Sequence, residues 1–303
     1  MRHFLDLKDF TRDELSAMLA YGLDLRKSLK AGQAHETPLA GKHFGMIFEK
    51  QSTRTRVSFE VGISQLGGVP IVLSANDMQL GRGESIADTS KVLSGYLDGV
   101  MIRCLSHNTL MDLAKHASMP VINGLTDRSH PCQVMADLMT MLDIHGVIEG
   151  QIVTWAGDGN NVAVSWIEAA VIMGFELRIA CPEGYEPPAD IVAWAREQGA
   201  AINFYNDLNE AAKDAHVIVT DVWISMGDDE GTRVKDMTPF QVNDAVMAQA
   251  APDAIFMHCL PAIREMEVTA SVIDGKQSAV WQEAENRLHA QKAILAYCCG
   301  GVI

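Results

Sequence analysis

The chain has 303 residues, which is more than a single hydrophobic core usually carries, so two domains are expected. Apolar residues make up 48% and charged residues 21%, the balance of a globular protein. A net charge of −15 argues against nucleic acid and against an anionic membrane as partners, although a few clustered arginines could still bind a small anion.

Six cysteines lie scattered along the chain without a CxxC pair or a cysteine–histidine ladder. Their spacing fits neither a structural zinc site nor, in a chain this long, a disulfide framework, so no metal and a reducing compartment are expected. The N-terminus has no basic region followed by an apolar run, and no stretch reaches the roughly 20 apolar residues of a membrane helix. These features predict a cytoplasmic protein.

The first half of the chain alternates short apolar runs with amphipathic stretches, which is typical of an α/β fold with a parallel sheet. Thr11 and Glu14 form the capping pattern Ser/Thr-x-x-Glu, and apolar residues then recur at helical spacing, so a helix is predicted there. Strands are predicted over residues 43–48, 69–73 and 99–102. Helices are predicted from Val57 onward and over about residues 130–145.

The alternation restarts after Gly146, so a domain boundary is predicted near residues 145–150. The second half is expected to contain a helix over about residues 163–173 and a closing helix over about residues 283–302. Strands are predicted over residues 151–155, 177–180, 201–204, 217–220 and 254–257.

The densest polar motif is the segment STRTR at residues 52–56, between the first predicted strand and the helix that follows. Hydroxyls and arginines at a strand-to-helix turn suit a phosphate group. Helix N–H groups and Ser/Thr hydroxyls donate hydrogen bonds, and guanidinium groups bind oxygens in pairs. The same residues could also form a helix cap with two solvated arginines. On these residues alone, both interpretations stay open.

Three more polar residues follow predicted elements of the first half. Arg103 ends the strand at 99–102, at the edge where parallel sheets place ligand groups. His130 and Gln133 begin the long helix, and their spacing puts them on one helix face, where both can donate to a carbonyl oxygen. Each has a simpler explanation, Arg103 as a surface ion pair and His130 as a helix cap.

Polar residues also follow three predicted strands of the second half. The loop GDGNN at residues 157–161 resembles a truncated dinucleotide loop, but it lacks the third glycine of GxGxxG. An oxidoreductase that binds NAD is therefore not indicated. Asp221 places a carboxylate after the strand at 217–220, and Cys259 follows the strand at 254–257. A capped turn and inert packing are the alternatives for these two residues.

Eight segments share a single resemblance. They read, in chain order, STRTR, DMQLGRGES, MIR, HPCQ, GDGNNVA, DVWISMG, HCLPA and ENRLHAQ. Their order and spacing resemble those of the ornithine carbamoyltransferases, over nearly the whole chain. The resemblance implies a transferase that moves the carbamoyl group of carbamoyl phosphate to the δ-amine of ornithine. The products are citrulline and phosphate, and neither a cofactor nor a metal is implied.

The resemblance also implies the residues of the site. Those that bind carbamoyl phosphate are Ser52, Thr53, Arg54, Thr55, Gln79, Arg103, His130, Gln133, Cys259, Leu260 and Arg287. Those that bind ornithine are Asn161, Asp221, Ser225 and Met226. The catalytic groups are Arg54, Thr55, Arg103, His130 and Cys259. In that set the arginine, hydroxyl and imidazole donors stabilise the tetrahedral oxyanion and the leaving phosphate, and the cysteine, linked to Asp221, helps to accept the proton of the amine.

The implied architecture has two doubly wound parallel-sheet domains with the active site between them. Residues 1–145 would bind carbamoyl phosphate, and residues 146–282 would bind ornithine. The closing helix, about residues 283–303, would fold back on the first domain. Gln79 would reach the site of a neighbouring subunit, which makes the implied assembly a homotrimer. The resemblance also implies a role in arginine biosynthesis.

Other acceptors and other protein classes fit the residues less well. Aspartate carbamoyltransferases share the STRTR and HPxQ segments but read HPLP where this chain has HCLP at residues 258–261. A dicarboxylate acceptor needs cations, whereas Asp221 supplies an anion. An N-acylated ornithine would leave Asp221 without a cationic partner, although it and putrescine remain alternative acceptors. A non-catalytic relative is not indicated, because every expected polar group is present.

Overall fold

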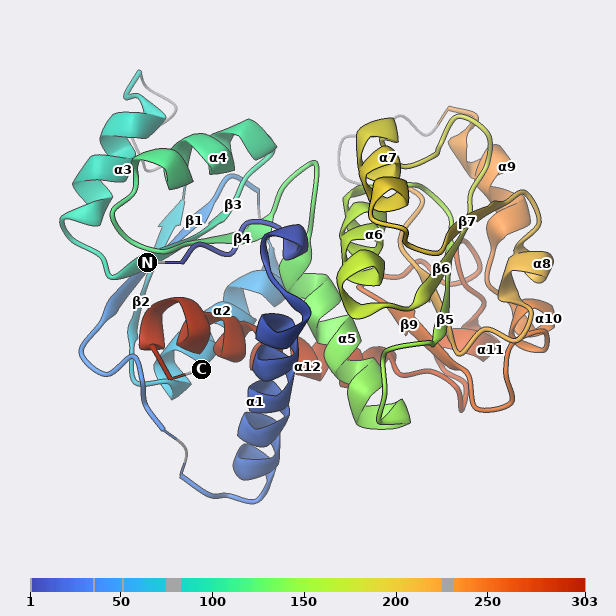
Figure 1. Cartoon of the computed structure of the whole chain (residues 1–303), viewed down its shortest axis with the longest axis horizontal. Coiled ribbons are helices and arrows are strands. Elements are labelled where there is room, and N and C mark those ends of the chain that lie inside the picture. The colour runs from blue at the N-terminus through green and yellow to red at the C-terminus, as the bar shows by residue number, and fades with distance from the viewer. Residues whose placement is uncertain (1, 35, 51, 75–82, 225–230, 303) are drawn as a thin grey trace. The chain divides into compact units, whose positions relative to one another are not determined.

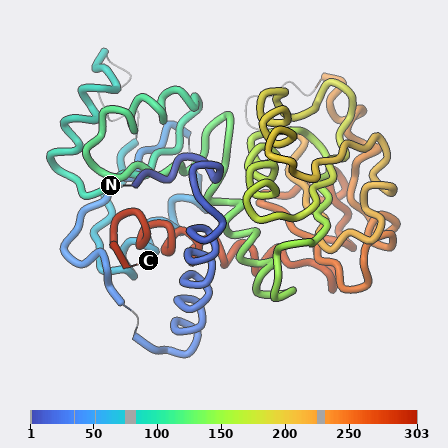
Figure 2. Tube along the Cα trace, in the orientation of Figure 1, coloured from blue at the N-terminus to red at the C-terminus, as the bar shows by residue number. Residues whose placement is uncertain are grey.

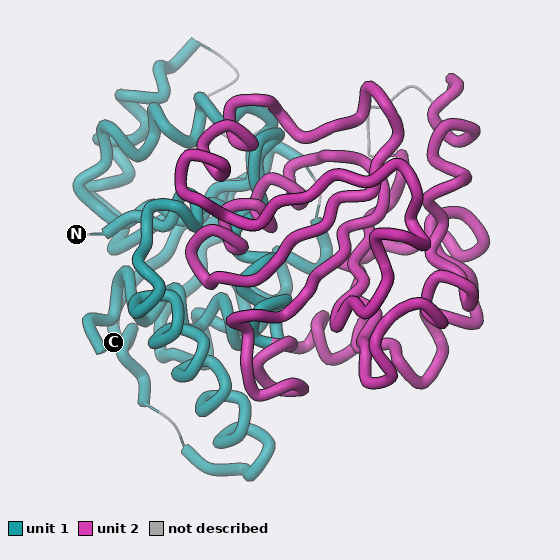
Figure 3. Tube along the Cα trace, turned by 45° about the vertical axis from the view of Figure 1, so that its right-hand side comes forward, with its two compact units in different colours: residues 1–139, 286–303 teal, residues 140–285 magenta. Residues whose placement is uncertain are grey.

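The computed structural model describes residues 2–34, 36–50, 52–74, 83–224 and 231–302. The chain forms two compact units (Figure 3), one made of Met1–Met139 with Asn286–Ile303 and the other of Thr140–Glu285. Each unit is an α/β structure built on a parallel sheet, so the expected fold class is confirmed. The chain passes from one unit to the other inside two helices, Pro131–His145 (α5) and Val280–Leu295 (α12).

The sheet of the first unit has four parallel strands in the order β2-β1-β3-β4. Their bounds are His43–Phe48 (β1), Val69–Ser74 (β2), Gly99–Arg103 (β3) and Val121–Leu125 (β4). The first three were predicted from their apolar runs, whereas β4 contains Asn123 and Gly124 and was not predicted as a strand. The strand order reverses between β1 and β3, and this is where open α/β sheets bind ligands, beyond the carboxyl ends of the strands.

Helices cover both faces of this sheet (Figure 1). They are Leu7–Asp9 (η1, a 3₁₀ turn), Arg12–Lys30 (α1), Thr53–Gln65 (α2), Ile86–Ser94 (α3), His107–His116 (α4) and the first part of α5. Helices α3 and α4 lie on one face, and α1 and α2 lie on the other. The capping pattern predicted for α1 is confirmed, because Thr11 N donates to Glu14 Oε2 at 2.8 Å and Glu14 N donates to Thr11 Oγ1 at 3.3 Å.

Helix α2 begins at Thr53, four residues before the expected start at Val57. That expectation took the first apolar residue as the start of the helix. The first turn of a helix needs no apolar residue, because its N–H groups point out of the helix toward solvent or a ligand. The segment at residues 52–56 therefore supplies the N-terminal turn of α2 and its unsatisfied N–H donors.

The C-terminal segment belongs to the first unit, as expected for a closing helix that folds back on the N-terminal domain. Helix α12 begins three residues before the expected position and is followed by one π-helical turn, Ala296–Gly300 (η5). In Figure 2 the red end of the chain lies beside the blue segment of α1. There Tyr297 Oη donates to Glu14 Oε1 at 2.5 Å, and Lys292 Nζ donates to Gln65 Oε1 of α2 at 3.0 Å.

The sheet of the second unit has five parallel strands in the order β7-β6-β5-β8-β9. Their bounds are Ile152–Ala156 (β5), Glu176–Ala180 (β6), Ile202–Tyr205 (β7), Val217–Thr220 (β8) and Ile255–His258 (β9). All five were predicted, each to within one residue. The register pairs Ala156 with Thr220 and Thr220 with His258, so β5, β8 and β9 end level with one another.

Helices also cover both faces of the second sheet (Figure 1). They are Asn161–Met173 (α6), Ala189–Glu197 (α7), Leu208–Ala212 (α8), Arg233–Met237 (α9), Thr238–Phe240 (η4, a 3₁₀ turn), Asp244–Met247 (α10) and Ala270–Ile273 (α11). Helices α6 and α7 lie on one face, and α8, α10 and α11 lie on the other. Among the described residues, no helix combines the length and the apolar composition that a membrane crossing needs.

Candidate functional site

Two arginines of the first unit converge on one buried hydroxyl near the point where its strand order reverses. Arg103, the last residue of β3, donates from Nη1 to Thr55 Oγ1 at 3.2 Å. Arg287 of α12 donates from Nη2 to the same oxygen at 2.9 Å. Register explains the first contact, because Arg103 pairs with Phe48 at the end of β1, and α2 follows β1 after a short loop.

Arg287 also joins this hydroxyl to helix α5. Its Nη1 donates to Gln133 Oε1 at 2.6 Å, and Gln133 Nε2 donates to Asp137 Oδ1 at 2.8 Å. Arg287, Gln133 and Asp137 are all buried. Asp137 was not singled out in the sequence, although its position four residues after Gln133 on a predicted helix is the spacing at which side chains meet. Hydrogen bonds therefore fix the guanidinium group of Arg287 on two sides.

His130 lies beside the two arginines and immediately precedes α5. Burial, followed by the positive charges of Arg287 and Arg103, holds the pKa of His130 well below its usual value. The imidazole is therefore neutral at physiological pH. A neutral imidazole can donate one directed hydrogen bond to a carbonyl oxygen without carrying a proton that the reaction would have to remove.

A hollow of about 360 Å³ opens at the start of α2. It is lined by Phe48, Glu49, Lys50, Ser52, Thr53, Arg56, Val72 and Ser74. Ser52 has an extended backbone at the N-cap of α2, and its side chain makes no capping hydrogen bond to the helix. The hollow thus contains hydroxyl groups, helix N–H donors and the cations of Lys50 and Arg56, together with the carboxylate of Glu49, which accepts from Leu105 N at 2.7 Å. The cations and donors outnumber this one anion, which suits the binding of an anion.

Three polar residues meet at the carboxyl ends of the strands in the second unit. Asp221 follows β8 and Cys259 follows β9, so the parallel register places them side by side. Cys259 Sγ donates to Asp221 Oδ1 at 2.9 Å. Asn160 Nδ2 donates to Asp221 Oδ2 at 2.9 Å, while its Oδ1 accepts from the first N–H groups of α6. The sequence interpretation named Asn161 and missed Asn160, whose position just before a helix is the signal of an N-cap.

Asp221, His258 and Cys259 each offer a metal-ligand atom, and these atoms lie within 4.8 Å of one another. Hydrogen bonds within the protein account for the arrangement. His258 Nε2 lies 3.2 Å from Glu267 Oε1, and its Nδ1 accepts from Leu260 N at 2.9 Å. Both ring nitrogens of His258 are therefore engaged by the protein, which leaves a hydrogen-bond network as the role that the geometry supports.

Comparison with protein families accounts for both units. The carbamoyl-P binding domain of aspartate/ornithine carbamoyltransferases matches residues 2–143, and the Asp/Orn binding domain of the same enzymes matches residues 149–298. The chain belongs to the aspartate/ornithine carbamoyltransferase family. The ornithine carbamoyltransferase of Rhodopseudomonas palustris (strain BisA53) is 54% identical over 306 residues, which covers 99% of this chain and 98% of that protein.

Solved structures of the family have the same fold. The ornithine carbamoyltransferase of Pyrococcus furiosus superposes with a TM-score of 0.95 at 49% identity, and the match covers 100% of this chain and 98% of that one. The anabolic ornithine carbamoyltransferase of Campylobacter jejuni superposes with a TM-score of 0.92 at 39% identity, covering 98% and 99%.

The structure gathers part of the site that family resemblance implies. In the first unit it brings together Thr55, Arg103, His130, Gln133 and Arg287, with Ser52, Thr53 and Arg54 at the start of α2. In the second unit it brings together Asp221 and Cys259, with Asn161 at the start of α6 and Leu260 next to the cysteine. Gln79, Ser225 and Met226 lie outside the described residues.

Proposed function

We propose that the protein transfers the carbamoyl group of carbamoyl phosphate to the δ-amine of L-ornithine, giving L-citrulline and phosphate. The observation that supports this most strongly is the convergence of Arg103 and Arg287 on Thr55, beside the N-terminus of α2 and a neutral His130. That arrangement offers positive charge for a phosphate and directed donors for a carbonyl oxygen. The relatives at about half sequence identity carry the same enzyme name.

The donor half of the reaction uses the residues of the first unit. Six groups would hold the phosphate: Ser52, Thr53, Arg54, Thr55, Arg103 and Arg287. The helix N-terminus and the guanidinium groups stabilise the dianion that leaves. His130 and Gln133 would meet the carbamoyl group, with the backbone of Cys259 and Leu260 completing its pocket. As the amine attacks, His130, Arg54 and Thr55 stabilise the oxyanion, and loss of one such donor costs about 10²–10³ in turnover.

The acceptor half uses the residues of the second unit. The Asp221 carboxylate would bind the α-ammonium group of ornithine, with Asn161, Ser225 and Met226 completing the recognition of its α-amino and carboxylate groups. Aspartate as acceptor would bring a second carboxylate toward the Asp221 anion, which is unfavourable. We accordingly assign carbamoyl phosphate to residues 1–145 with about 283–303, and ornithine to residues 146–282.

The δ-amine of ornithine must lose a proton before it attacks. Its free pKa lies near 10, and positive charge together with desolvation lowers the pKa of a bound amine. We assign the acceptance of this proton to Cys259 together with Asp221. The sulfur of Cys259 takes the proton of the amine as the thiol proton passes along the hydrogen bond from Sγ to Asp221 Oδ1, which measures 2.9 Å.

We also propose a homotrimer in which Gln79 enters the site of a neighbouring subunit. Apolar side chains are exposed next to the anion site: Val57 and Val61 on α2, and Val69 and Ile71 on the edge strand β2. Val57 is 53% and Val69 is 45% exposed, and exposed apolar side chains grouped on one surface are typical of an interaction site. A second copy of the chain would cover them.

Mixed trimers test this assembly. Gln79→Ala and His130→Ala should each be nearly inactive. If each site takes residues from two subunits, trimers reassembled from a mixture contain some sites with both residues intact, and activity returns. Mixtures that stay inactive would place Gln79 in the site of its own subunit, and a monomer in sedimentation would refute the trimer itself.

The same proposal extends to the cellular role. We infer a biosynthetic enzyme of arginine metabolism in the cytoplasm. The match to an anabolic relative supports the direction, and the lack of disulfides among the described residues fits a reducing compartment.

Citrulline formation is the direct test of the acceptor. The purified protein is supplied with carbamoyl phosphate and with ornithine, putrescine, N-acetylornithine or aspartate at equal concentration, and release of phosphate is followed with each. Ornithine should give the highest kcat/KM. A higher value with putrescine or N-acetylornithine would transfer the assignment to that acceptor, and an absence of phosphate release with all four would refute carbamoyl transfer.

A further inference from the structure

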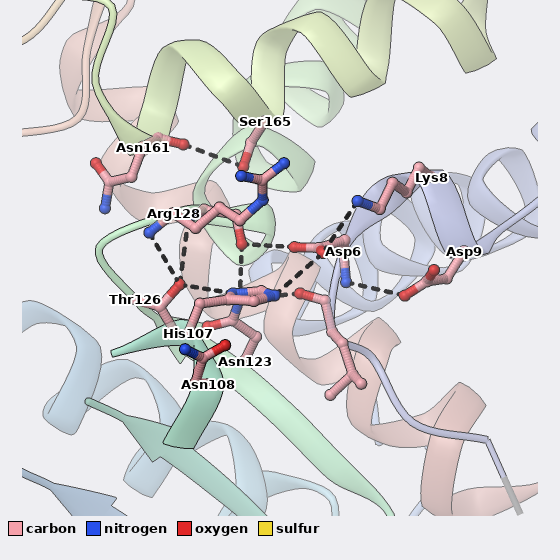
Figure 4. A network of polar contacts seen from close by, with 12 residues as sticks. Asp6, Lys8, Asp9, His107, Asn108, Asn123, Thr126, Arg128, Asn161 and Ser165 are labelled. Atoms are coloured by element: carbon pink, nitrogen blue, oxygen red, sulfur yellow. Dashed lines mark hydrogen bonds and ion pairs between the residues drawn. The ribbon is translucent and has the colours of Figure 1, made fainter. Parts of the chain in front are cut away.

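The N-terminal segment of the chain runs along strand β4. Phe4 N donates to Val121 O at 2.9 Å, and Asn123 N donates to Phe4 O at 2.8 Å. Asn123 Nδ2 donates in addition to Leu5 O at 2.9 Å. These bonds place the next residue, Asp6, over the loop that leads from β4 to α5 (Figure 4).

Asp6 carries a buried carboxylate, and its two oxygens bind different groups. Only 4% of the residue is exposed. Oδ1 accepts from Ser129 Oγ at 2.5 Å, and Oδ2 lies 3.5 Å from His107 Nε2 and 3.7 Å from Lys8 Nζ. One oxygen of the carboxylate thus lies near the Lys8 ammonium group, and the other accepts a short, charge-assisted hydrogen bond from the Ser129 hydroxyl.

Ser129 is bound through its hydroxyl and through both of its backbone groups. Ser129 Oγ accepts from Asn123 Nδ2 at 3.0 Å while it donates to Asp6. Ser129 N donates to Thr126 Oγ1 at 3.2 Å, and Ser129 O accepts from Thr126 N at 3.0 Å. Asn123, Thr126 and Ser129 are fully buried. The turn over residues 126–129 is therefore held from inside the unit, and its last residue has little conformational freedom.

The residue that follows Ser129 is His130. Because no residue separates them, the orientation of the Ser129 peptide sets the direction in which the chain enters α5 and presents the imidazole. A neutral histidine donates a single hydrogen bond, so its effect on a developing oxyanion depends on direction as well as distance. Displacement of a catalytic group by about 1 Å can cost about 10²-fold in rate.

We propose that Asp6 is a positioning residue for His130 and acts through the hydroxyl of Ser129. The inference rests on the proposed function, in which His130 meets the carbamoyl group. Burying a carboxylate carries a large desolvation cost. If the group served only to hold the turn, a neutral or apolar pair could do this at a lower desolvation cost. The short bond to Ser129 instead gives the turn a strong and directed restraint next to the reacting group.

The test compares two buried serines. Ser129→Ala and Asp6→Ala remove the bond, whereas Ser90→Ala removes a matched one, since Ser90 is fully buried and its Oγ donates to Leu113 O at 2.8 Å, away from the turn. Both serine variants should lose thermal stability, and Ser129→Ala should lose more, because its hydroxyl makes two bonds and one of them is to a buried carboxylate. At a temperature well below unfolding, Ser129→Ala and Asp6→Ala should lose about 10-fold in kcat, and Ser90→Ala should keep the wild-type kcat.

Two further variants separate positioning from general damage to the fold. Asp6→Asn keeps an oxygen that can accept from Ser129 but loses the charge, so its kcat should lie between that of the wild type and that of Asp6→Ala. The double variant Asp6→Ala/Ser129→Ala should lose no more than either single variant, because both act through one bond. Losses that multiply, or kinetics of Ser129→Ala equal to those of Ser90→Ala, would overturn the proposal.

Calorimetric binding of carbamoyl phosphate is the second readout, and it needs no acceptor. Affinity should fall in Ser129→Ala and stay at the wild-type value in Ser90→Ala. Suppose that the wild-type protein makes no citrulline, but that Ser129→Ala binds carbamoyl phosphate more weakly than the wild type and Ser90→Ala does not. The acceptor assignment then fails and the positioning role stands. If the wild-type protein makes citrulline and both serine variants bind equally, the positioning role fails alone.

Discussion

Arg287 Nη2 lies 2.9 Å from Thr55 Oγ1, although 232 positions separate the two residues in the chain. The other terminal nitrogen of Arg287 binds Gln133 Oε1 at 2.6 Å. A single guanidinium group therefore joins the first turn of α2, helix α5 and helix α12. Its planar fork suits this task, whereas a lysine ammonium group on the same position could not make both bonds in the same geometry.

We expect Arg287→Lys to lower kcat/KM for carbamoyl phosphate by about 10²-fold, because the charge remains but the paired, directed bonds are lost. Steady-state kinetics with carbamoyl phosphate varied measures the effect. Arg196→Lys, on the exposed surface of α7, is the matched control and should leave kcat/KM unchanged. A wild-type value for Arg287→Lys would show that charge alone suffices there.

Cys259→Ala should lower kcat by about 10²-fold, the usual contribution of a positioned proton acceptor. Its KM for carbamoyl phosphate should change far less. Cys181→Ala provides the control, because Cys181 is a buried cysteine of the same unit in which burial raises the thiol pKa to about 12. Full turnover of Cys259→Ala across the pH profile would rule out proton acceptance by this thiol.

Gly159→Ala should destabilise the second unit by roughly 3 kcal/mol, because an added Cβ would lie 2.2 Å from Pro187 N and 2.5 Å from Glu186 C. The displaced loop should also raise KM for ornithine, since Asn160 binds Asp221. Chemical denaturation and acceptor kinetics measure the two effects. Gly199→Ala should cost only about 1 kcal/mol, because Gly199 has a positive φ but no atom within 4 Å of the added carbon. Equal losses would show that the loop yields to the added methyl group.

Lys292 should make the stability of the protein depend on pH. The residue is fully buried, and burial lowers its pKa from 10.5 to about 8. Between pH 8 and pH 10.5 the unfolded chain then binds more protons than the folded one, so stability rises with pH. Below that window the cost of burying the charge is fully present, and above it the cost is gone.

The variant Lys292→Met isolates this contribution. The free energy of unfolding of the wild type minus that of the variant should rise by about 3 kcal/mol from pH 7.5 to pH 10.5. This is most of the shift of Lys292 converted at about 1.4 kcal/mol per pKa unit, because part of the titration falls outside that pH range. Other groups that titrate there, including the buried cysteines, affect both proteins alike. A difference that stays flat with pH would mean that Lys292 keeps an ordinary pKa.

The strands of both sheets were predictable because a strand buried on both faces of a parallel sheet needs a continuous apolar run. Strand β4 is the exception, since it contains Asn123 and Gly124. A buried asparagine is tolerated there because Asn123 Nδ2 binds Leu5 O, which is 118 positions away, and Ser129 Oγ. No local pattern predicts such a partner.

The sequence by itself determined the alternation of strands and helices, the capped start of α1 and the polar segments that resemble one enzyme family. Each depends on residues within a few positions of one another, where local spacing decides burial and hydrogen bonding. Only the tertiary structure decided that Arg287 meets Thr55, that Asn160 binds Asp221, and that Asp6 reaches Ser129. These pairs lie 232, 61 and 123 positions apart, so their contacts arise only when a whole unit has packed and set the register of its elements.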